Sequence, residues 1–276
     1  MDISQLQITF LGGGNMCEAM VRGFINNGGI DPKKITVSTP SKRTENTYKE
    51  LKVNHVVGDN KSSVKGADII IYCVKPYMVK PVSEEINSIV SEKGNPLVIS
   101  VMAGVTIDTL SSVLNGYGRC ARVMPNTPSL VGAGACGYAL SPKCADTDGE
   151  LVEKLLSSIG VVKKVAENLI DSVTGVSGSG PAYVYMFIEA LGDAGVVNGL
   201  DRATSRALAA QTVFGAAKMV LENPDVHIAQ LRNNVESPAG TTVSGTSTLE
   251  KEGLRACVIK AVTAATDKAK ELGKSN

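Results

Sequence analysis

Three consecutive glycines near the start of the chain are the residues whose type and spacing best suit a chemical role. Gly12, Gly13 and Gly14 directly follow the apolar run Ile8 to Leu11, and a segment with helical spacing of apolar residues comes next. Such a strand–glycine–helix turn can present backbone N–H groups and the positive end of a helix dipole to a phosphate. Gly12 would make the tight turn, and Gly14 would let a pyrophosphate approach the backbone. Glycine-rich turns also occur without a ligand, so this stretch alone leaves both interpretations open.

A second polar stretch follows the predicted strand Lys34 to Ser38. Dinucleotide-binding sheets that accept NAD place an acidic residue at this point for the ribose 2′-hydroxyl. This chain has no acid there and offers the hydroxyls of Ser38 and Thr39 and the cations Lys42 and Arg43. These groups could bind a 2′-phosphate, which favours NADP over NAD. The alternative interpretation is that the two cations only open a solvated helix.

A third polar stretch, Asn234 to Val243, enters a predicted helix near Thr242. Pro238 restricts its backbone, and Ser237, Thr241 and Thr242 supply hydroxyls. Backbone N–H groups at a helix start can hold a carboxylate, so the loop is a candidate anion site. A capped helix start without a ligand is the alternative.

The composition excludes several classes of protein. The net charge is +1 and tryptophan is absent, so we expect no nucleic-acid partner. The two histidines have no ligand spacing, so we expect no metal site. The six cysteines form no CxxC pair, which is typical of reduced thiols in the cytoplasm. The longest apolar run, Ala67 to Val74, is too short to cross a membrane, and the first strand leaves no room for a signal peptide. A cytoplasmic protein without a membrane partner is expected.

Strands and helices alternate up to about Ala166, which predicts an α/β fold with one open, mostly parallel, doubly wound sheet of the Rossmann type. Further strands are predicted at residues 55–57, 67–74, 97–101, 119–124 and 135–140, and helices near residue 62 and at 78–90, 107–114 and 150–159. Ligands collect at the carboxyl ends of the strands in such sheets. After Asn168, Ala-rich helical patterns replace the strands, at residues 183–194, 203–221, 226–231 and 254–272.

The helix at residues 203–221 is apolar almost all round and must be buried on most sides. About 110 helical residues cannot bury enough apolar surface by themselves, so we infer that the helices of two chains intertwine in a homodimer. The predicted domains are therefore residues 1–166, a nucleotide-binding domain, and residues 167–276, an all-α dimerisation and substrate domain.

Six motifs occur in an order that resembles the pyrroline-5-carboxylate reductase family. They are Gly12 to Met16, Val74 to Pro76, Ala103 to Thr106, Met124 to Pro128, Ser177 to Tyr183 and Ser237 to Thr242. The resemblance covers essentially the whole chain. It implies an NAD(P)H-dependent reductase that makes L-proline, with a Rossmann domain and a helical dimerisation domain. Members of the family commonly assemble dimers into larger rings, often decamers.

The resemblance also implies roles for individual residues. It assigns the pyrophosphate loop to Gly12, Gly14, Asn15 and Met16, and the 2′-phosphate end to Ser38 and Thr39, beside which the residue pattern adds Arg43. It assigns the cofactor lining to Asn60, Val74, Lys75 and Pro76, the vicinity of the nicotinamide to Ala103 and Asn126, and the substrate loop to Ser237, Gly240, Thr241 and Thr242. Two residues depart from the family pattern: Cys17 replaces the usual Ala, and Ala239 replaces a frequent Gly, which affects the backbone shape of the substrate loop.

The implied chemistry suits these residues. A cyclic imine is basic enough to arrive protonated, so hydride transfer from the nicotinamide of NADPH, or of NADH as the alternative, needs no poised histidine or carboxylate. The Thr242 hydroxyl is predicted to bond the imine nitrogen, and backbone groups from Ser237 to Thr241 to bind the carboxylate. Whether the loop serves its own subunit or the partner's is left open. Rival hypotheses are a broader imine reductase, a 6-phosphogluconate-type hydroxyacid dehydrogenase and a non-catalytic NADP-binding scaffold. The second usually has a lysine on its first long helix after the cofactor domain, and none occurs between Tyr183 and Gly199.

Overall fold

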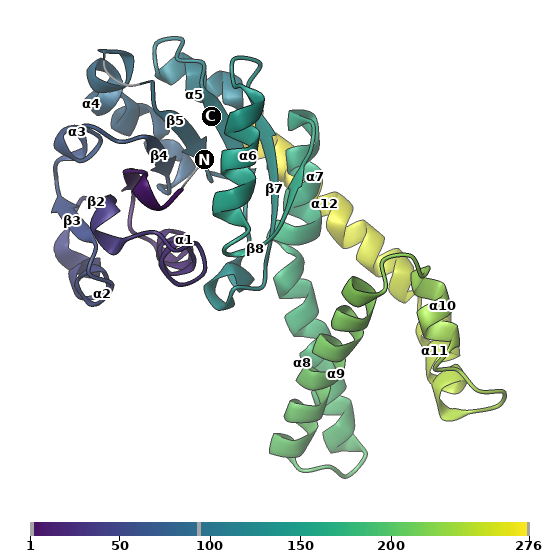
Figure 1. Ribbon diagram of the computed structural model, residues 1–276. Helices are drawn as coiled ribbons and strands as arrows, with labels where there is room; N and C mark the ends of the chain where they lie inside the picture. Colours follow the sequence, from purple (N-terminus) through teal and green to yellow (C-terminus); the bar gives the residue numbers. More distant parts are fainter. Residues whose placement is uncertain (1–2, 93–94, 275–276) are drawn as a thin grey trace. The chain divides into compact units, whose positions relative to one another are not determined.

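The computed structural model describes residues 3–92 and 95–274, and these include one eight-stranded sheet (Figure 1). Its strands are β1 (Ile8–Leu11), β2 (Ile35–Thr39), β3 (Asn54–Val57), β4 (Ile69–Tyr72), β5 (Leu97–Ser100), β6 (Cys120–Met124), β7 (Gly134–Leu140) and β8 (Gly160–Lys164). The order is β3-β2-β1-β4-β5-β6-β7-β8, and all neighbours are parallel except β6 and β7. The predicted open, mostly parallel sheet is confirmed.

Helices cover both faces of this sheet because its strands are apolar on both sides. In β4, Ile69 and Ile71 belong to one core cluster, and Ile70 and Tyr72 to the other. The helices that contribute to the first cluster are α1 (Asn15–Asn26), α2 (Glu45–Glu50) and α6 (Asp146–Leu156), whereas α4 (Val79–Glu92) and α5 (Ile107–Val113) contribute to the second. Alternate residues of a strand point to opposite faces, so two helical layers enclose the sheet.

The sequence pattern did not predict β8. This edge strand holds only two apolar residues, Val161 and Val162, before two lysines, and Val161 is exposed. Gly160 precedes them with φ +150°, and a Cβ there would overlap the backbone of Gly134. The pairing of β7 with β8 therefore depends on a close backbone approach that an apolar-run pattern does not reveal.

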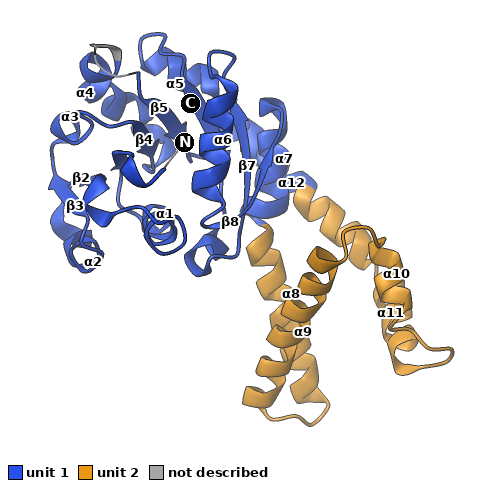
Figure 2. Ribbon diagram, viewed as in Figure 1, with its two compact units in different colours: residues 1–179, 263–276 blue, residues 180–262 orange. Residues whose placement is uncertain are grey.

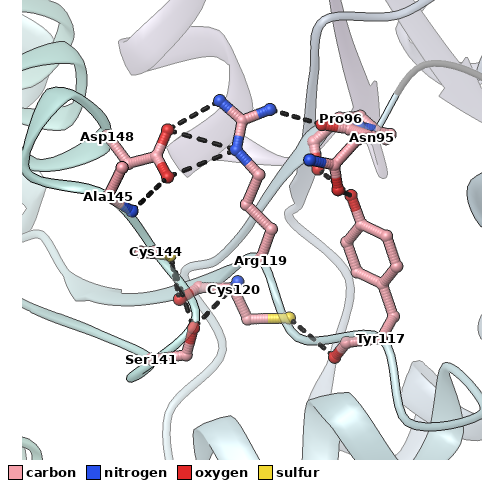
Figure 3. Close-up of polar contacts among 9 residues, drawn as sticks. All are labelled: Asn95, Pro96, Tyr117, Arg119, Cys120, Ser141, Cys144, Ala145 and Asp148. Carbon is pink, nitrogen blue, oxygen red and sulfur yellow. Dashed lines mark hydrogen bonds and ion pairs between the residues drawn. The ribbon is translucent and has the colours of Figure 1, made fainter.

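An ion pair joins the start of β6 to helix α6 (Figure 3). Arg119 Nη2 lies 2.6 Å from Oδ1 of Asp148, and the guanidinium also donates to the carbonyl of Asn95. The other carboxylate oxygen accepts the Ala145 N–H at 3.0 Å, which satisfies one orphan donor at the start of α6. Burial alone would raise the pKa of Asp148, but the hydrogen bonds and charge of Arg119 and the Ala145 N–H outweigh it and hold this pKa below its ordinary value.

The chain divides into two compact units, one of residues 1–179 with 263–276 and one of residues 180–262 (Figure 2). The segment before the division is α7 (Ile170–Val173), which continues into a π-helical turn (Thr174–Gly178). Within this segment the Thr174 and Ser177 hydroxyls donate to the carbonyls of Ile170 and Val173, one turn back.

The second unit holds α8 (Gly180–Val197), α9 (Arg202–Glu222), α10 (Ile228–Asn233), α11 (Thr241–Lys251) and the first half of α12 (Leu254–Lys274). Small residues bring α8 and α9 together: the Ser205 hydroxyl donates to the carbonyl of Gly192 at 2.6 Å. Large apolar side chains nevertheless stay exposed on both helices, such as Tyr185 (61%), Met186 (69%) and Phe214 (61%). No helix among the described residues is both long enough and apolar enough to span a membrane.

The second half of α12 belongs to the first unit. There the backbone approaches the loop after β5 closely: a Cβ on Gly104 would lie 3.1 Å from the nitrogen of Gly273. Gly104 itself has φ +76°, which favours glycine. The loop that carries Ala103 is thus packed against residues from the other end of the described chain.

Candidate cofactor and substrate sites

The predicted cofactor residues all lie at one edge of the sheet. Strands β1 to β6 are parallel, and each of them is followed at its carboxyl end by at least one such residue, or ends in one. They are Gly12, Gly14, Asn15 and Met16 after β1, Ser38, Thr39 and Arg43 at the end of β2, Asn60 after β3, Val74, Lys75 and Pro76 after β4, Ala103 after β5 and Asn126 after β6. The carboxyl edge of a doubly wound sheet is where such folds bind ligands.

The glycine loop combines one crowded position with one open position. Gly12 has φ +101°, and a Cβ there would lie 2.7 Å from the oxygen and 2.8 Å from the carbon of the Cys73 carbonyl. Gly14 has no atom within 4 Å of an added Cβ, and it caps helix α1. The N–H groups of the first turn of α1 have no partner within the helix. Gly12 is therefore needed to make the turn, whereas the space at Gly14 is open to a ligand.

Gly13, the one glycine of the loop without a predicted role of its own, is closely packed against other residues. A Cβ there would lie 2.5 Å from Cγ2 of Thr39 and 2.9 Å from the ring of Tyr48. Its position between Gly12 and Gly14 was the one sign in the sequence that Gly13 contributes to the loop. The thiols of Cys17 and Cys73 lie near Tyr48, and the hydrogen bond of the Cys73 thiol with Cys17, together with burial, raises the pKa of Cys73. The fully buried side chain of Cys17 occupies the position of the usual Ala.

The end of β2 departs from the prediction in one respect. The hydroxyls of both Ser38 and Thr39 are buried and already bonded within the protein: Ser38 donates to Oδ1 of Asn60 at 2.7 Å, and Thr39 donates to the carbonyl of Ser41 at 2.8 Å. Arg43 is exposed in the short turn that follows. Hydrogen-bond donors for a ligand at the end of β2 must therefore come from the turn that follows the strand, where Arg43 lies.

Asn60 is held in one orientation by two neighbours. Its Oδ1 accepts from Ser38, and its Nδ2 donates to Oε2 of Glu85 on α4 at 2.9 Å. Glu85 could not be found from the sequence, since an exposed glutamate on an amphipathic helix has no distinctive pattern. The hydrogen bond from Asn60 to Glu85 fixes the orientation of the Asn60 side-chain amide.

The remaining cofactor residues line the loops after β4, β5 and β6. Lys75 is exposed at the start of the Pro76–Met78 turn, and Ala103 is half-buried. Asn126 is buried and joins two segments, because its Nδ2 donates to the carbonyl of Ser177 at 3.0 Å and its Oδ1 accepts the Ala135 N–H at 2.9 Å. This geometry gives Asn126 a positioning role in the loop.

The predicted substrate residues belong to the second unit, in the turn that leads into α11. The Gly240 N–H donates to the carbonyl of Ser237 at 3.0 Å, Pro238 occupies the second position, and Ala239 has φ +54°. This is the pattern of a type II turn, whose third position favours glycine. A Cβ on Gly240 would overlap Oγ of Ser237. The departure at Ala239 thus leaves the turn intact but places a side chain in the left-handed region.

Helix α11 begins directly after this turn, with Gly240 as its N-cap. Thr241 is exposed and Thr242 half-buried, and neither hydroxyl has a hydrogen-bond partner in the part of the chain that the structure describes. Glu236, on the other side of the turn, accepts the Thr246 hydroxyl at 2.7 Å and thereby ties the turn to its helix. No sequence pattern indicated this glutamate. Within residues 3–92 and 95–274, no cluster of three or more metal-ligating side chains occurs.

The strand order, the glycine turn and the carboxyl-edge site together define a Rossmann-type dinucleotide-binding protein with an added helical unit. Comparison with known proteins narrows this class. Residues 167–272 match the profile described as pyrroline-5-carboxylate reductase dimerisation, and residues 7–104 match that of NADP oxidoreductase coenzyme F420-dependent. The chain belongs to the pyrroline-5-carboxylate reductase family.

Individual relatives support this membership along nearly the whole length. Pyrroline-5-carboxylate reductase of Arabidopsis thaliana is 38% identical over 98% of this chain and 96% of its own. The solved structure of a pyrroline-5-carboxylate reductase from Coxiella burnetii is 40% identical with a TM-score of 0.90, covering 97% of this chain and 98% of that one. The Plasmodium falciparum pyrroline carboxylate reductase, whose structure has NADP bound, is 36% identical with a TM-score of 0.87, covering 98% of this chain and 99% of that one.

Proposed function

We propose that this protein reduces the C=N bond of 1-pyrroline-5-carboxylate with NADPH and forms L-proline, the last step of proline biosynthesis. One observation carries the proposal: the chain combines an open glycine position at the carboxyl edge of its sheet with a separate turn, Ser237 to Thr242, whose threonine hydroxyls are unbonded among the described residues. The first suits a dinucleotide and the second a small polar substrate. Its relatives carry the name of this reductase.

The cofactor-binding residues in this proposal are those at the carboxyl edge. Gly12, Gly14, Asn15 and Met16 hold the pyrophosphate on the N-terminus of α1. The rest are Ser38, Thr39 and Arg43 at the adenosine ribose, Asn60, Val74, Lys75 and Pro76 along the cofactor, and Ala103 and Asn126 near the nicotinamide. When bound, NADPH supplies the hydride, and NADH is the alternative donor.

The substrate residues are Ser237, Gly240, Thr241 and Thr242. N–H groups at the start of α11 bind the carboxylate, aided by the helix dipole. The Thr242 hydroxyl accepts a hydrogen bond from the protonated imine nitrogen and so orients the adjacent ring carbon toward the hydride. No protein group has to supply a proton, because the imine nitrogen already carries one.

The test is NADPH oxidation in the presence of pyrroline-5-carboxylate, followed by absorbance, with NADH and with the keto form of a hydroxyacid as comparisons. We expect consumption with the imine and none with the keto acid. Thr242→Ala should lower kcat/KM about tenfold or more, since hydrogen bonds to charged groups contribute about 1.5–3 kcal/mol. Thr248→Ala is the matched control, because that hydroxyl donates to the carbonyl of Ser244 within α11. Equal activity of Thr242→Ala and wild type would remove Thr242 from the mechanism.

The assembly and the domains are part of the proposal. The proposed domains are residues 1–166 for NADP binding and residues 167–276 for dimerisation and substrate binding, and the profile match that begins at residue 167 supports this boundary. The compact units divide the chain differently, after residue 179 and again after residue 262. The exposed apolar side chains of α8 and α9 support an intertwined homodimer, with rings of dimers up to a decamer as the larger form. Light scattering at several concentrations tests the assembly. The free cysteines support a cytoplasmic location, which cell fractionation tests.

A further inference from the structure

His55 lies next to the predicted 2′-phosphate corner, although it belongs to no motif. It sits on β3, where the register pairs it with Val37 of β2, so His55 and Thr39 lie on the same face of the sheet. The Nε2 atom of His55 lies 2.8 Å from Oγ1 of Thr39. Thr39 is the last residue of β2 and precedes the turn that holds Lys42 and Arg43.

The direction of this hydrogen bond follows from the number of protons available. The hydroxyl of Thr39 carries one proton, which it donates to the carbonyl of Ser41 at 2.8 Å. Its oxygen must therefore accept from His55, which carries a proton on Nε2. Thr39 has no second proton for a phosphate oxygen, which is only an acceptor.

The donors for a 2′-phosphate must then come from the residues after Thr39. Ser41, Lys42 and Arg43 are exposed and supply a hydroxyl and two cations. The hydrogen bond from the Thr39 hydroxyl to the Ser41 carbonyl holds the start of this turn. The buried oxygen of the same hydroxyl accepts the N–H of His55. Without His55 the Thr39 hydroxyl would lose its only donor partner given by the structure.

His55 also touches the wall behind the glycine loop. Its ring packs on Tyr48 with centroids 5.6 Å apart, and Tyr48 in turn lies against Gly13. Damage to this packing would affect the pyrophosphate loop and hence NADPH and NADH alike. Loss of the hydrogen bond alone would affect only the turn at the 2′ position.

We propose that His55 is a positioning residue for cofactor choice. By donating to Thr39 it holds the turn from Thr39 to Arg43 in the conformation that presents Ser41, Lys42 and Arg43 to the 2′-phosphate of NADPH. NADH lacks this phosphate and gains nothing from the contact. The inference rests on the proposed use of NADPH.

The test compares His55→Phe, which keeps the ring packing and removes the N–H, with His55→Gln, which keeps an N–H donor at the end of the side chain. Dissociation constants for NADPH and NADH are measured by fluorescence titration without substrate, together with KM and kcat. We expect His55→Phe to weaken NADPH binding about fivefold, from a hydrogen bond of about 1 kcal/mol, with NADH within about twofold and kcat unchanged. His55→Gln should restore NADPH binding.

Two further variants sharpen the result. His227→Asn is the control, because His227 only caps α10 through the Ala229 N–H and asparagine is a good cap. Thr39→Val should reduce NADPH binding like His55→Phe, and the double variant should lose no more than either. Equal weakening of both cofactors, no change, or additive losses would overturn the inference. A wild-type protein that binds neither dinucleotide would overturn the proposed function and this inference with it.

Discussion

Alanine substitutions at Gly12 and Gly14 should separate folding from cofactor binding. At Gly12 an alanine would adopt φ +101°, which costs about 1–2 kcal/mol for a residue with a Cβ. The Cβ would also lie 2.7 Å and 2.8 Å from the carbonyl oxygen and carbon of Cys73, and 2.9 Å from Cγ1 of Val74. Two of these atoms belong to backbone, so the loop must shift, at a further cost of about 1–3 kcal/mol.

The shift would also disturb the hydrogen bonds that fix the loop. The Gly12 N–H donates to the carbonyl of Ser38 at 2.8 Å, and the Cys73 N–H donates to the carbonyl of Leu11 at 2.8 Å. We therefore expect Gly12→Ala to lower the free energy of unfolding by about 2–5 kcal/mol, a fall in Tm of roughly 5–15 °C. Thermal unfolding at one fixed protein concentration measures it, because association shifts Tm.

Gly14→Ala should behave in the opposite way. Its φ is −84° and an added Cβ would meet no protein atom within 4 Å, so Tm should change by no more than about 2 °C. The same Cβ would occupy the space through which the pyrophosphate approaches, so KM for NADPH should rise at least about tenfold. A Gly14→Ala enzyme with wild-type KM, or a Gly12→Ala protein with wild-type Tm, would refute this account of the loop.

Three further predictions concern other parts of the chain. Ala239→Gly should raise the free energy of unfolding by about 0.5 kcal/mol in urea titrations, since relief of about 1 kcal/mol of left-handed strain exceeds the gain in unfolded-state entropy; a destabilised variant would contradict the type II turn. Asp148→Asn should lower the free energy of unfolding by about 2–3 kcal/mol at pH 7, because it breaks a largely buried pair with Arg119. The pKa of Asp148 is lowered in the folded protein, so its ionised carboxylate stabilises the fold above the ordinary carboxyl pKa, and this stabilisation is lost as pH falls through the pKa of the folded state. In acid unfolding experiments the wild type should therefore lose more stability than Asp148→Asn. Glu236→Ala should raise KM for the imine several-fold without changing KM for NADPH, because the Thr246 hydroxyl loses its acceptor. Glu236→Gln should keep that acceptor and the wild-type KM. Equal KM values for Glu236→Ala and wild type would exclude a role of Glu236 in holding the turn.

Most of the sheet could be predicted because each buried parallel strand is a short apolar run between polar turns. Residues 8–11 and 97–101 are such runs, and they form β1 and β5 within one residue of the predicted bounds. The strand β8 could not be found this way, since an edge strand needs few apolar residues and its pairing rests on the backbone contact of Gly160 with Gly134.

The placement of the candidate residues at one edge of the sheet could be predicted, but their hydrogen bonds could not. Motif order places Ser38, Thr39 and Asn60 at the carboxyl edge, but a sequence does not tell which neighbour accepts a hydroxyl proton. The partners of Thr39 come from the next turn and from His55 on another strand, and the partner of Asn60 comes from α4. These contacts depend on register and side-chain reach, which no local pattern specifies.

The return of α12 to the first unit links the order of synthesis to the order of folding. Ribosomes make the six parallel strands first, yet the loop that carries Ala103 stays without its neighbour Gly273 until translation has passed the whole helical unit. Domains otherwise tend to fold as they emerge. In this chain the loop at the carboxyl end of β5 must wait for residues 263–274, so a truncated translation product lacks the packing of this loop even though all of its strands are present.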